Sequence, residues 1–249
     1  MERLLEDVKK IAGLMEKSRY TVVLSGAGIS TEGSGPDFQN PDSALWKMVA
    51  PSDFTIHRFE NDPEAFYEAG APYFDLLEEA EPNEVHIVLA ELEKRGLVKM
   101  VITQNIDGLH QRAGSENVLE IHGTLRSASC VQCDYGVLLK DVLPETGKST
   151  QPPQCPKCGE ILKPDVVFSG EPPPPDFERA KEAVKRAELL IIVGSNMQTP
   201  PVDQLPVGGG DLVIINHVPT GYDGQARVVV NESAARVMRL LLEELDKRK

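Results

Sequence analysis

Apolar residues recur along the chain in two alternating patterns, one with the spacing of a helix and one typical of a buried strand. Residues 4–17 place apolar side chains on one stripe of a helix. Residues 20–25 then form a short apolar run that leads directly into a glycine-rich turn at 26–30. A strand that ends in such a turn is where an open α/β sheet binds nucleotides.

The same alternation continues to the C-terminus. It predicts strands at 98–103, 118–121, 189–193, 212–215 and 227–230, and helices at 85–94, 106–113, 176–187 and from 234 onward. Asp176 and Ser233 are expected to cap helices, and Gly96 to end one. Several strands are apolar enough to be covered on both faces, as parallel strands are. The predicted fold class is α/β, with a doubly wound, Rossmann-like parallel sheet.

Two segments interrupt this alternation. Residues 35–80 carry prolines, aromatics and acidic residues without a strong strand signal, and residues 125–165 hold all four cysteines. We therefore predict a large domain with a smaller domain inserted into it. The Rossmann-like domain would comprise 1–36, 81–124 and 166–249, and the small domain a helical module at 37–80 and a zinc ribbon at 125–165.

The four cysteines form two Cys-x-x-Cys pairs that are separated by 21 residues. Two such pairs can surround one ion with four thiolates in the tetrahedral arrangement that structural zinc requires. A site closed by four sulfurs has no open coordination position, so we expect a structural Zn²⁺ at Cys130, Cys133, Cys155 and Cys158. Two redox pairs, unrelated buried thiols and an iron centre are the alternatives.

Composition narrows the possible partners. With 39 acidic and 26 basic residues the formal net charge is −13. Nucleic-acid-binding proteins normally have a basic balance, because phosphate neutralisation supplies most of their affinity, so the charge favours basic partners instead. There is no apolar run of about 18 residues, and the N-terminus lacks a basic segment followed by an apolar one. We therefore expect no membrane span, no secretory signal and a cytosolic location.

Five short motifs follow the predicted strands: TQNIDGLHQRAG at 103–114, EIHG at 120–123, FSGE at 168–171, GSN at 194–196 and IIN at 214–216. The glycine turn at 26–30 is weak evidence by itself, because Thr31 stands where a dinucleotide fingerprint has its third glycine. Taken together and in this order, with EIHG directly before the cysteine module, the motifs resemble the sirtuin family of NAD-dependent protein deacylases. The resemblance covers nearly the whole chain.

The resemblance implies that NAD is consumed as a co-substrate. In sirtuins the acyl-lysine carbonyl oxygen attacks C1′ of the nicotinamide ribose, nicotinamide departs, and the acyl group finally leaves on ADP-ribose. The matching catalytic residues here are His122 as general base, Asn105 near the ribose and water, and Asp107 at the nicotinamide carboxamide. From the residues alone, His122 could equally end a strand, and Asn105 and Asp107 could cap a helix.

The resemblance also implies an NAD-binding set. The turn at 26–30 would offer backbone N–H groups to the pyrophosphate, a second turn at 194–196 would face it, and Asn216 would meet the adenosine ribose. Without the resemblance these turns would be ordinary strand-to-helix connections. The full implied set is Gly26, Ala27, Gly28, Ile29, Ser30, Asp37, Phe38, Gln39, Gln104, Asn105, Ile106, Asp107, His122, Gly194, Ser195, Asn196, Asn216 and His217.

The expected partner is an acyl-lysine protein or peptide, with no nucleic acid and no membrane. The segment that matches the family's peptide-binding strand comprises Val167, Phe168, Ser169, Gly170 and Glu171, and main-chain pairing there would tolerate many sequences. Sirtuins that remove acidic acyl groups carry a tyrosine and arginine pair in the helical module. Residues 66–75 contain no arginine, so acetyl or longer aliphatic groups are favoured.

The remaining histidines and the tryptophan have no implied role in the chemistry. His57, His86, His110 and His217 show no metal-ligand spacing, and His110 is expected to pack or to bond locally. Trp46 is expected to pack in the small domain. For His217 two alternatives stay open: the resemblance places it in the NAD site, whereas the residues alone give it no role.

The chain departs from the family pattern at 33–39, which reads GSGPDFQ where members usually have SGIPDFR. Gln39 in place of arginine supplies no charge for a pyrophosphate, and Gly35 loosens the loop. We expect an active deacetylase with weaker NAD binding or an unusual substrate. Mono-ADP-ribosyl transfer to a protein and a non-enzymatic NAD-sensing or interaction module are the alternatives. A dehydrogenase is disfavoured by the incomplete fingerprint.

Overall fold

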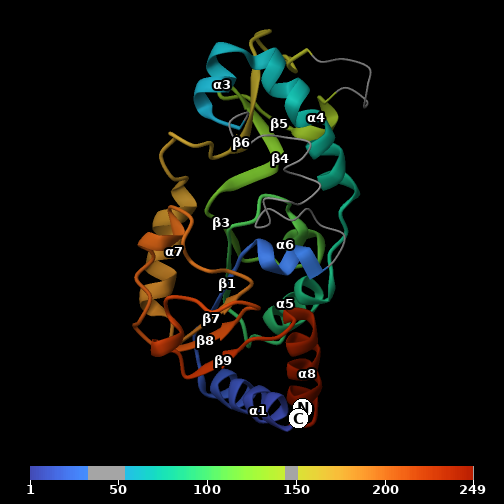
Figure 1. The fold of residues 1–249 in the computed structure, drawn as a ribbon. Coiled ribbons are helices and arrows are strands. Elements are labelled where there is room, and N and C mark those ends of the chain that lie inside the picture. The colour runs from blue at the N-terminus through green and yellow to red at the C-terminus, as the bar shows by residue number, and fades with distance from the viewer. Residues whose placement is uncertain (33–53, 144–150, 249) are drawn as a thin grey trace.

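The computed structural model describes residues 1–32, 54–143 and 151–248 of the chain. Its largest element is a six-stranded parallel sheet with the order β3-β2-β1-β7-β8-β9, and a three-stranded antiparallel sheet, β5-β4-β6, lies beyond one end of it (Figure 1). The large sheet comprises β1 Thr21–Ser25, β2 Met100–Thr103, β3 Val118–Glu120, β7 Leu189–Val193, β8 Asp211–Ile215 and β9 Val228–Val230. The small one comprises β4 Gly123–Cys130, β5 Gly136–Leu138 and β6 Leu162–Val166.

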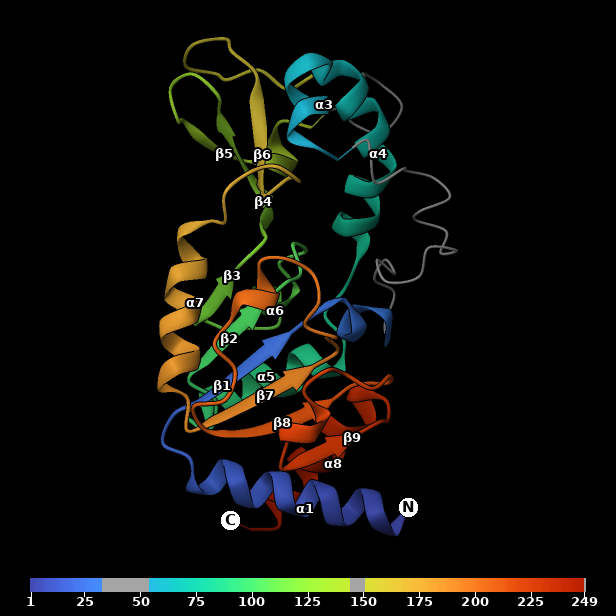
Figure 2. The same cartoon turned by 60° about the vertical axis from the view of Figure 1, so that its left-hand side comes forward.

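Helices cover both faces of the large sheet, which confirms the predicted doubly wound α/β class. Successive strand residues point to opposite faces, so Val23 packs with one group of helices and Leu24 with another. The first face is covered by α1 Glu2–Lys17, α5 Glu84–Lys94 and α8 Ala234–Asp246. The second face is covered by α7 Pro175–Arg186, which lies along the sheet in Figure 2. No helix among the described residues is long and apolar enough to cross a membrane.

The small antiparallel sheet shares a separate core with two helices, α3 Ile56–Asn61 and α4 Pro63–Glu79. Phe66 of α4 packs edge-on against Phe168, with ring centroids 5.1 Å apart. The Tyr67 hydroxyl donates to the Leu162 carbonyl at 2.7 Å. The helical module and the ribbon therefore pack as one unit. The domain boundaries stay a prediction, and Trp46 lies outside the described residues.

Two predicted helix starts are wrong, and tertiary contacts explain both. Asp176 does not cap α7, because Pro174 occupies the N-cap and the Asp176 carboxylate instead accepts from Glu120 N at 3.1 Å. The helix predicted at 106–113 is only α6, Leu109–Arg112. Its first residues are held outside the helix, since Ile106 O accepts from Leu125 N. The predicted cap at Ser233 is confirmed by its bond from Arg236 N.

The strand order reverses between β1 and β7. The next strands along the chain, β2 and β3, are added on one side of β1, whereas β7, β8 and β9 extend from the other side. Open α/β sheets bind ligands at such a point, outside the carboxyl ends of the strands. The turn at 26–30 follows β1 and the turn at 194–196 follows β7, so both candidate phosphate turns lie there.

Candidate active site and metal centre

The two glycine turns touch through bare backbone. Gly28 N donates to Gly194 O at 2.9 Å, and Gly26 N donates to Val193 O at 3.1 Å. A Cβ atom on Gly28 would lie 2.8 Å from Gly194 Cα, and one on Gly194 would lie 2.6 Å from Ile29 N. No side chain fits between the turns, and Gly194 also has a positive φ of 62°. The N–H groups of Gly26, Gly28 and Ile29 are all bonded to carbonyl oxygens, so an anion at this surface would have to use other N–H groups of the turns.

Ser30 connects the turn to two of the predicted catalytic residues. The Asn105 side-chain amide donates to Ser30 Oγ at 3.1 Å and lies 3.4 Å from Gly26 O. Ser30 Oγ in turn donates to Asp107 Oδ2 at 3.2 Å. The structure thus brings together the end of β1 and the end of β2. The helix-capping alternative is wrong for Asn105, whose side chain points to the turn.

Asp107 has both a local and a long-range role. Its Oδ1 accepts from Leu109 N at 3.0 Å, although Gly108 and not Asp107 is the N-cap of α6, while Oδ2 faces Ser30. Burial raises the pKa of Asp107, and the bonds from Leu109 and Ser30 act in the opposite direction. A half-buried carboxyl fixed in this way can bind an amide group of a ligand.

His122 lies where the chain passes from the large sheet to the small one. Its Nδ1 is 2.8 Å from Gln104 O, and because a carbonyl oxygen only accepts, Nδ1 carries the hydrogen. The other nitrogen, Nε2, lies 3.2 Å from Pro200 O. Burial lowers the pKa of His122, against a smaller opposite effect of the two carbonyl groups. A neutral ring has one N–H and can donate to only one of these two carbonyl groups; the shorter contact favours the hydrogen on Nδ1 and leaves Nε2 as the basic nitrogen.

Gly123 allows this crossing between the sheets. It has a φ of 75°, and a Cβ atom there would collide with the backbone of Asp165. Beside it, Val167 N donates to His122 O at 2.9 Å. Both strands that join the small sheet to the large domain therefore meet at His122. In the sequence Gly123 appears only as the last residue of the EIHG motif. Nothing in the sequence pattern predicts its positive φ.

The other predicted NAD-site residues lie at neighbouring strand ends. Gln104 donates through Nε2 to the buried Ser195 Oγ at 2.6 Å, which joins the ends of β2 and β7. The Asn196 carboxamide bonds locally to Gln198, and the Asn216 side chain donates to Val218 O at 2.9 Å. The remaining residues of the predicted NAD set differ in solvent exposure: Ile29 is buried, Ala27 and Ile106 are half-buried, and His217 is exposed. Asp37, Phe38 and Gln39 lie outside the described residues.

The predicted peptide-binding segment is folded back on itself. Phe168 is buried and its N–H donates to Glu171 Oε2 at 2.7 Å, while Glu171 N donates to Phe168 O at 3.0 Å. Lys163 pairs with Glu171 at 3.1 Å and lies over the Phe168 ring. Ser169 forms an isolated parallel β-bridge with Thr55, the residue before α3. The side chain of Glu171 is thus committed to the turn, and part of the backbone is also paired, since Val167 N donates to His122 O and Ser169 O accepts from Ile56 N.

The four cysteines converge as predicted. Their Sγ atoms all lie within 4.8 Å of one another. Cys130 and Cys158 are 3.4 Å apart, Cys133 and Cys158 3.6 Å, and Cys133 and Cys155 3.8 Å. A tetrahedral zinc site with bonds of about 2.3 Å has sulfur–sulfur edges of about 3.8 Å. The cluster therefore fits one Zn²⁺.

The backbone around each cysteine pair is built alike. The amide two residues after the first cysteine donates to its Sγ at 3.4 Å in both pairs. The residue after the second cysteine has a positive φ in both, 54° at Asp134 and 84° at Gly159. These two matching turns aim four thiolates at one point, and amide N–H groups stabilise their charge.

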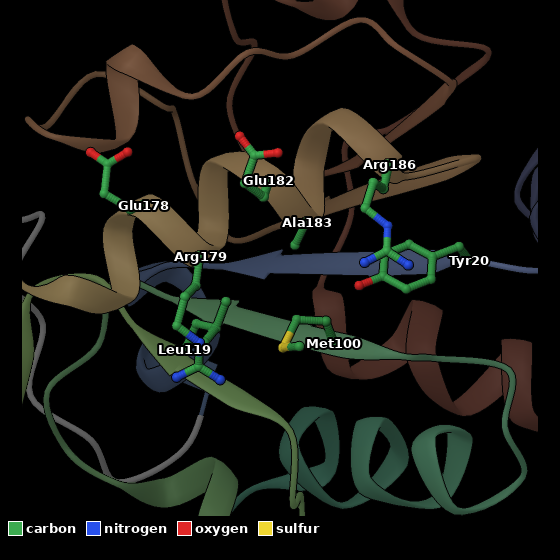
Figure 3. Close-up of a pocket in the computed structure, with 8 residues that line it drawn as sticks. All are labelled: Tyr20, Met100, Leu119, Glu178, Arg179, Glu182, Ala183 and Arg186. Atoms are coloured by element: carbon green, nitrogen blue, oxygen red, sulfur yellow. The ribbon is translucent and has the colours of Figure 1, made fainter.

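Two hollows differ in their relation to the strand-end cluster. One, of about 390 Å³, lies between α7 and the sheet. Figure 3 shows the residues that line it: Met100, Leu119 and Ala183 are apolar, and Arg186 lies over the ring of Tyr20. It contains none of the predicted site residues. A cavity of about 470 Å³ borders Asp107 and is otherwise lined from the small domain and α6.

Sequence reasoning missed the polar groups that support the site from behind. His110 is buried, as the packing alternative predicted, but it does not bond locally: its Nε2 lies 2.8 Å from Ser25 Oγ in β1. Pro200 O, which faces His122, was also missed. The one usable signal was Asn83 three residues before His86, the spacing of a capping box, which the structure contains.

Comparisons with known proteins agree with this geometry. The sequence model of the Sir2 family matches residues 26–201. The NAD-dependent protein deacetylase 2 of Caldanaerobacter subterraneus is 43% identical over 232 residues, 93% of each chain. The NAD-dependent protein deacetylase of Thermotoga maritima is 40% identical over 245 residues, 95% of this chain and 98% of its own.

Solved structures give the same result. A Sir2 structure with a p53 peptide and NAD⁺ is 37% identical, covers 95% of this chain and 97% of its own, and superposes with a TM-score of 0.85. A second, on the structural basis of sirtuin substrate affinity, is 38% identical with coverages of 95% and 98% and a TM-score of 0.88. The chain belongs to the Sir2 family.

Proposed function

We propose that this protein is an NAD-dependent protein-lysine deacetylase. One observation carries the proposal. Asn105, Asp107 and Ser30 are hydrogen-bonded together beside the two glycine turns, where the strand order reverses between β1 and β7. His122 lies just after β3, the strand next to β2. Relatives that match more than nine-tenths of the chain are named NAD-dependent protein deacetylases. Solved Sir2 structures hold NAD⁺ and acetylated peptide.

The turns and the strand-end residues would divide the work of holding NAD. Backbone N–H groups at 26–30 other than those of Gly26, Gly28 and Ile29, which are bonded to carbonyl oxygens, would bind the pyrophosphate. Gln104 would hold Ser195 of the opposite turn in place. Asp107 would accept from the nicotinamide carboxamide, and Asn105 would orient the ribose and a water. Such fixed contacts position C1′ for attack by the acyl oxygen of a bound acyl-lysine.

His122 would act as the base for the ribose hydroxyls. The bond from Nδ1–H to Gln104 O fixes the tautomer, so that Nε2 receives the proton. Once Nε2 is protonated it can donate to Pro200 O, which lies 3.2 Å away. Both hydrogens of the charged ring then have a carbonyl acceptor. Burial keeps the resting ring neutral, and the two carbonyl groups stabilise the protonated form that the reaction requires.

We further propose that the peptide pairs with the backbone at 167–170, beside His122, and that Zn²⁺ at the four cysteines is structural. The domain division at the boundaries given above and the roles of Asp37, Phe38, Gln39 and His217 stand as proposals from the sequence. A cytosolic location is also a proposal, and it is supported by four cysteines that form no disulfide, as a reducing compartment would keep them.

One incubation tests the activity. The protein is mixed with NAD and an acetyl-lysine peptide, and all products are followed by mass. Deacetylated peptide with equal amounts of nicotinamide and O-acetyl-ADP-ribose is the expected result. A mass gain of ADP-ribose on protein would instead support mono-ADP-ribosyl transfer, and unchanged NAD would indicate a non-enzymatic module. His122→Tyr is the matched variant, which should bind NAD but release no deacetylated peptide.

A further inference from the structure

One ammonium group lies against the segment where the peptide is proposed to bind. Lys163 belongs to β6, and its side chain is only 19% exposed. Lysine is almost never so well shielded from water unless its charge is paired, because burying an unpaired ammonium is costly. The proposed chemistry gives Lys163 no role, so its partners are the clue to what it does.

The ammonium has an acceptor for each of its three hydrogens. Nζ of Lys163 donates to Pro164 O at 3.1 Å and to Val166 O at 3.0 Å, and it pairs with Glu171 Oε2 at 3.1 Å. It also lies 4.5 Å from the centroid of the Phe168 ring, within the range of a cation–π contact. An ammonium has three donors and no acceptor, so these contacts use its full capacity. One charged group therefore holds both ends of the segment from 164 to 171.

Glu171 brings the chain back to the ammonium. Its Oε2 accepts from Phe168 N at 2.7 Å as well as from Lys163, and Glu171 N donates to Phe168 O at 3.0 Å. Gly170, which lies between the two, has a φ of 100°, a conformation that other residues rarely adopt. Residues 168–171 thus form a closed turn, and the charge of its carboxylate is balanced by Lys163.

The rest of the segment is attached on both sides. Val167 N donates to His122 O at 2.9 Å, and Ser169 O accepts from Ile56 N at 3.5 Å. Phe168, between them, is 5% exposed and packs in the core of the small domain. A backbone that is held in this way before a ligand arrives saves the ligand the cost of ordering it.

We propose that Lys163 is a positioning residue for the substrate peptide, because its ammonium fixes the backbone at 167–170 in the conformation with which the peptide pairs. The inference rests on the proposed function. None of the hydrogen bonds that Lys163 makes with described residues is with His122 or with the glycine turns. Loss of the ammonium should therefore weaken peptide binding and leave NAD binding unchanged.

Two substitutions at Lys163 separate its charge from its packing. Lys163→Met keeps an unbranched apolar chain beside Phe168 but removes all three donors, whereas Lys163→Arg keeps a charge for Glu171. We expect Lys163→Met to raise the Kd and the KM for an acetyl-lysine peptide about tenfold, the cost of ordering roughly one backbone residue on binding. The Kd for NAD should not change, and Lys163→Arg should recover most of the lost peptide affinity. Calorimetric titration with each ligand and steady-state kinetics give these constants.

Arg95 provides a matched control at the other end of the molecule's ion pairs in sequence. Its side chain is 18% exposed and pairs with Glu91 and with Asp246, each at 2.7 Å. It follows α5 and makes no ion pair with the segment from 164 to 171. Arg95→Met removes an equally shielded cation, so it should lower the melting temperature and leave both affinities unchanged.

A lysine that only stabilises the fold would behave as Arg95 does. If Lys163→Met lowers the melting temperature but binds peptide like wild type, or if the methionine and arginine variants lose peptide affinity equally, the positioning role is wrong. A wild type that binds acetyl-peptide but does not deacetylate it would overturn the proposed function alone, because the comparison of peptide affinities needs no turnover. A wild type that binds no acetyl-peptide would overturn both.

Hydrogen exchange tests the turn in the wild-type protein, whether or not the variants fold. The amides of Phe168 and Glu171 should be protected in the absence of peptide, since each donates within the turn. Unprotected exchange at both amides would show that the segment is not held before the peptide binds, and would overturn the proposal.

Discussion

The contact between the two glycine turns can be tested by adding single methyl groups. Gly194→Ala would suffer twice, because its φ is 62° and its Cβ would lie 2.6 Å from Ile29 N. Gly28→Ala would be destabilised by crowding alone, because its Cβ would lie 2.8 Å from Gly194 Cα while its φ is outside the left-handed region. Gly114→Ala isolates the conformational cost, since its φ is 103° and nothing lies within 4 Å of its Cβ.

These differences set the expected magnitudes. A left-handed backbone costs a non-glycine residue about 1–2 kcal/mol, and crowding in a packed site costs about 1–3 kcal/mol. We therefore expect Gly114→Ala to lower the free energy of unfolding by about 1–2 kcal/mol, Gly28→Ala by about 1–3 kcal/mol, and Gly194→Ala by about 2–5 kcal/mol. Crowding also separates the turns, so both turn variants should lose NAD affinity while Gly114→Ala should not.

Urea unfolding and calorimetric titration with NAD measure the two quantities for the three variants. The reasoning fails if Gly194→Ala is no less stable than Gly114→Ala. It also fails if Gly28→Ala and Gly194→Ala bind NAD as tightly as wild type, because the close approach of the two backbones would then have no part in binding.

Three further predictions concern the base, the metal and the cofactor loop. Because the pKa of His122 is lowered from 6.5, the ring is neutral above that lowered value, so kcat/KM should be lost only as the pH falls below 6.5; an acid limb above 6.5 in a pH–rate profile would contradict this. Removing Zn²⁺ with a strong chelator should make residues 123–166 sensitive to protease while the large sheet keeps its circular dichroism; full resistance would show that the metal has no structural role. Gln39→Arg should lower the KM for NAD by adding a charge for the pyrophosphate; an unchanged or higher value would show that Gln39 is no deficit.

The sequence could predict the sheet because its strands are buried on both faces and read as continuous apolar runs. Leu189–Val193 was predicted with its observed bounds for that reason. The cysteine cluster was predictable because ligand spacing within each pair is local. Helix starts failed where a distant group takes the local bonding partner: Leu125 N bonds to the backbone carbonyl of Ile106, and Glu120 N bonds to the side-chain carboxylate of Asp176. Local pattern contains no information about such partners.

The supporting contacts of the site were invisible for a related reason. Ser25 and His110 are 85 residues apart in the sequence, and Gln104 and Ser195 are 91 apart. Each belongs to a common residue type in an unremarkable position. Only the order of the strands shows that these side chains must meet, and apolar runs do not reveal which strand lies next to which.

The same topology predicts that catalysis depends on a metal that does no chemistry. The chain enters the ribbon through Gly123, directly after His122, and leaves it through Val167, whose N–H is bonded to His122 O. The cysteines hold the far ends of these strands together, with Cys130 closing β4. If zinc is lost, the strands on both sides of His122 lose their common anchor, and the bond from Nδ1 to Gln104 O no longer has a fixed geometry. The rate should then fall through kcat, while NAD, which binds mainly to the turns of the large sheet, should still bind.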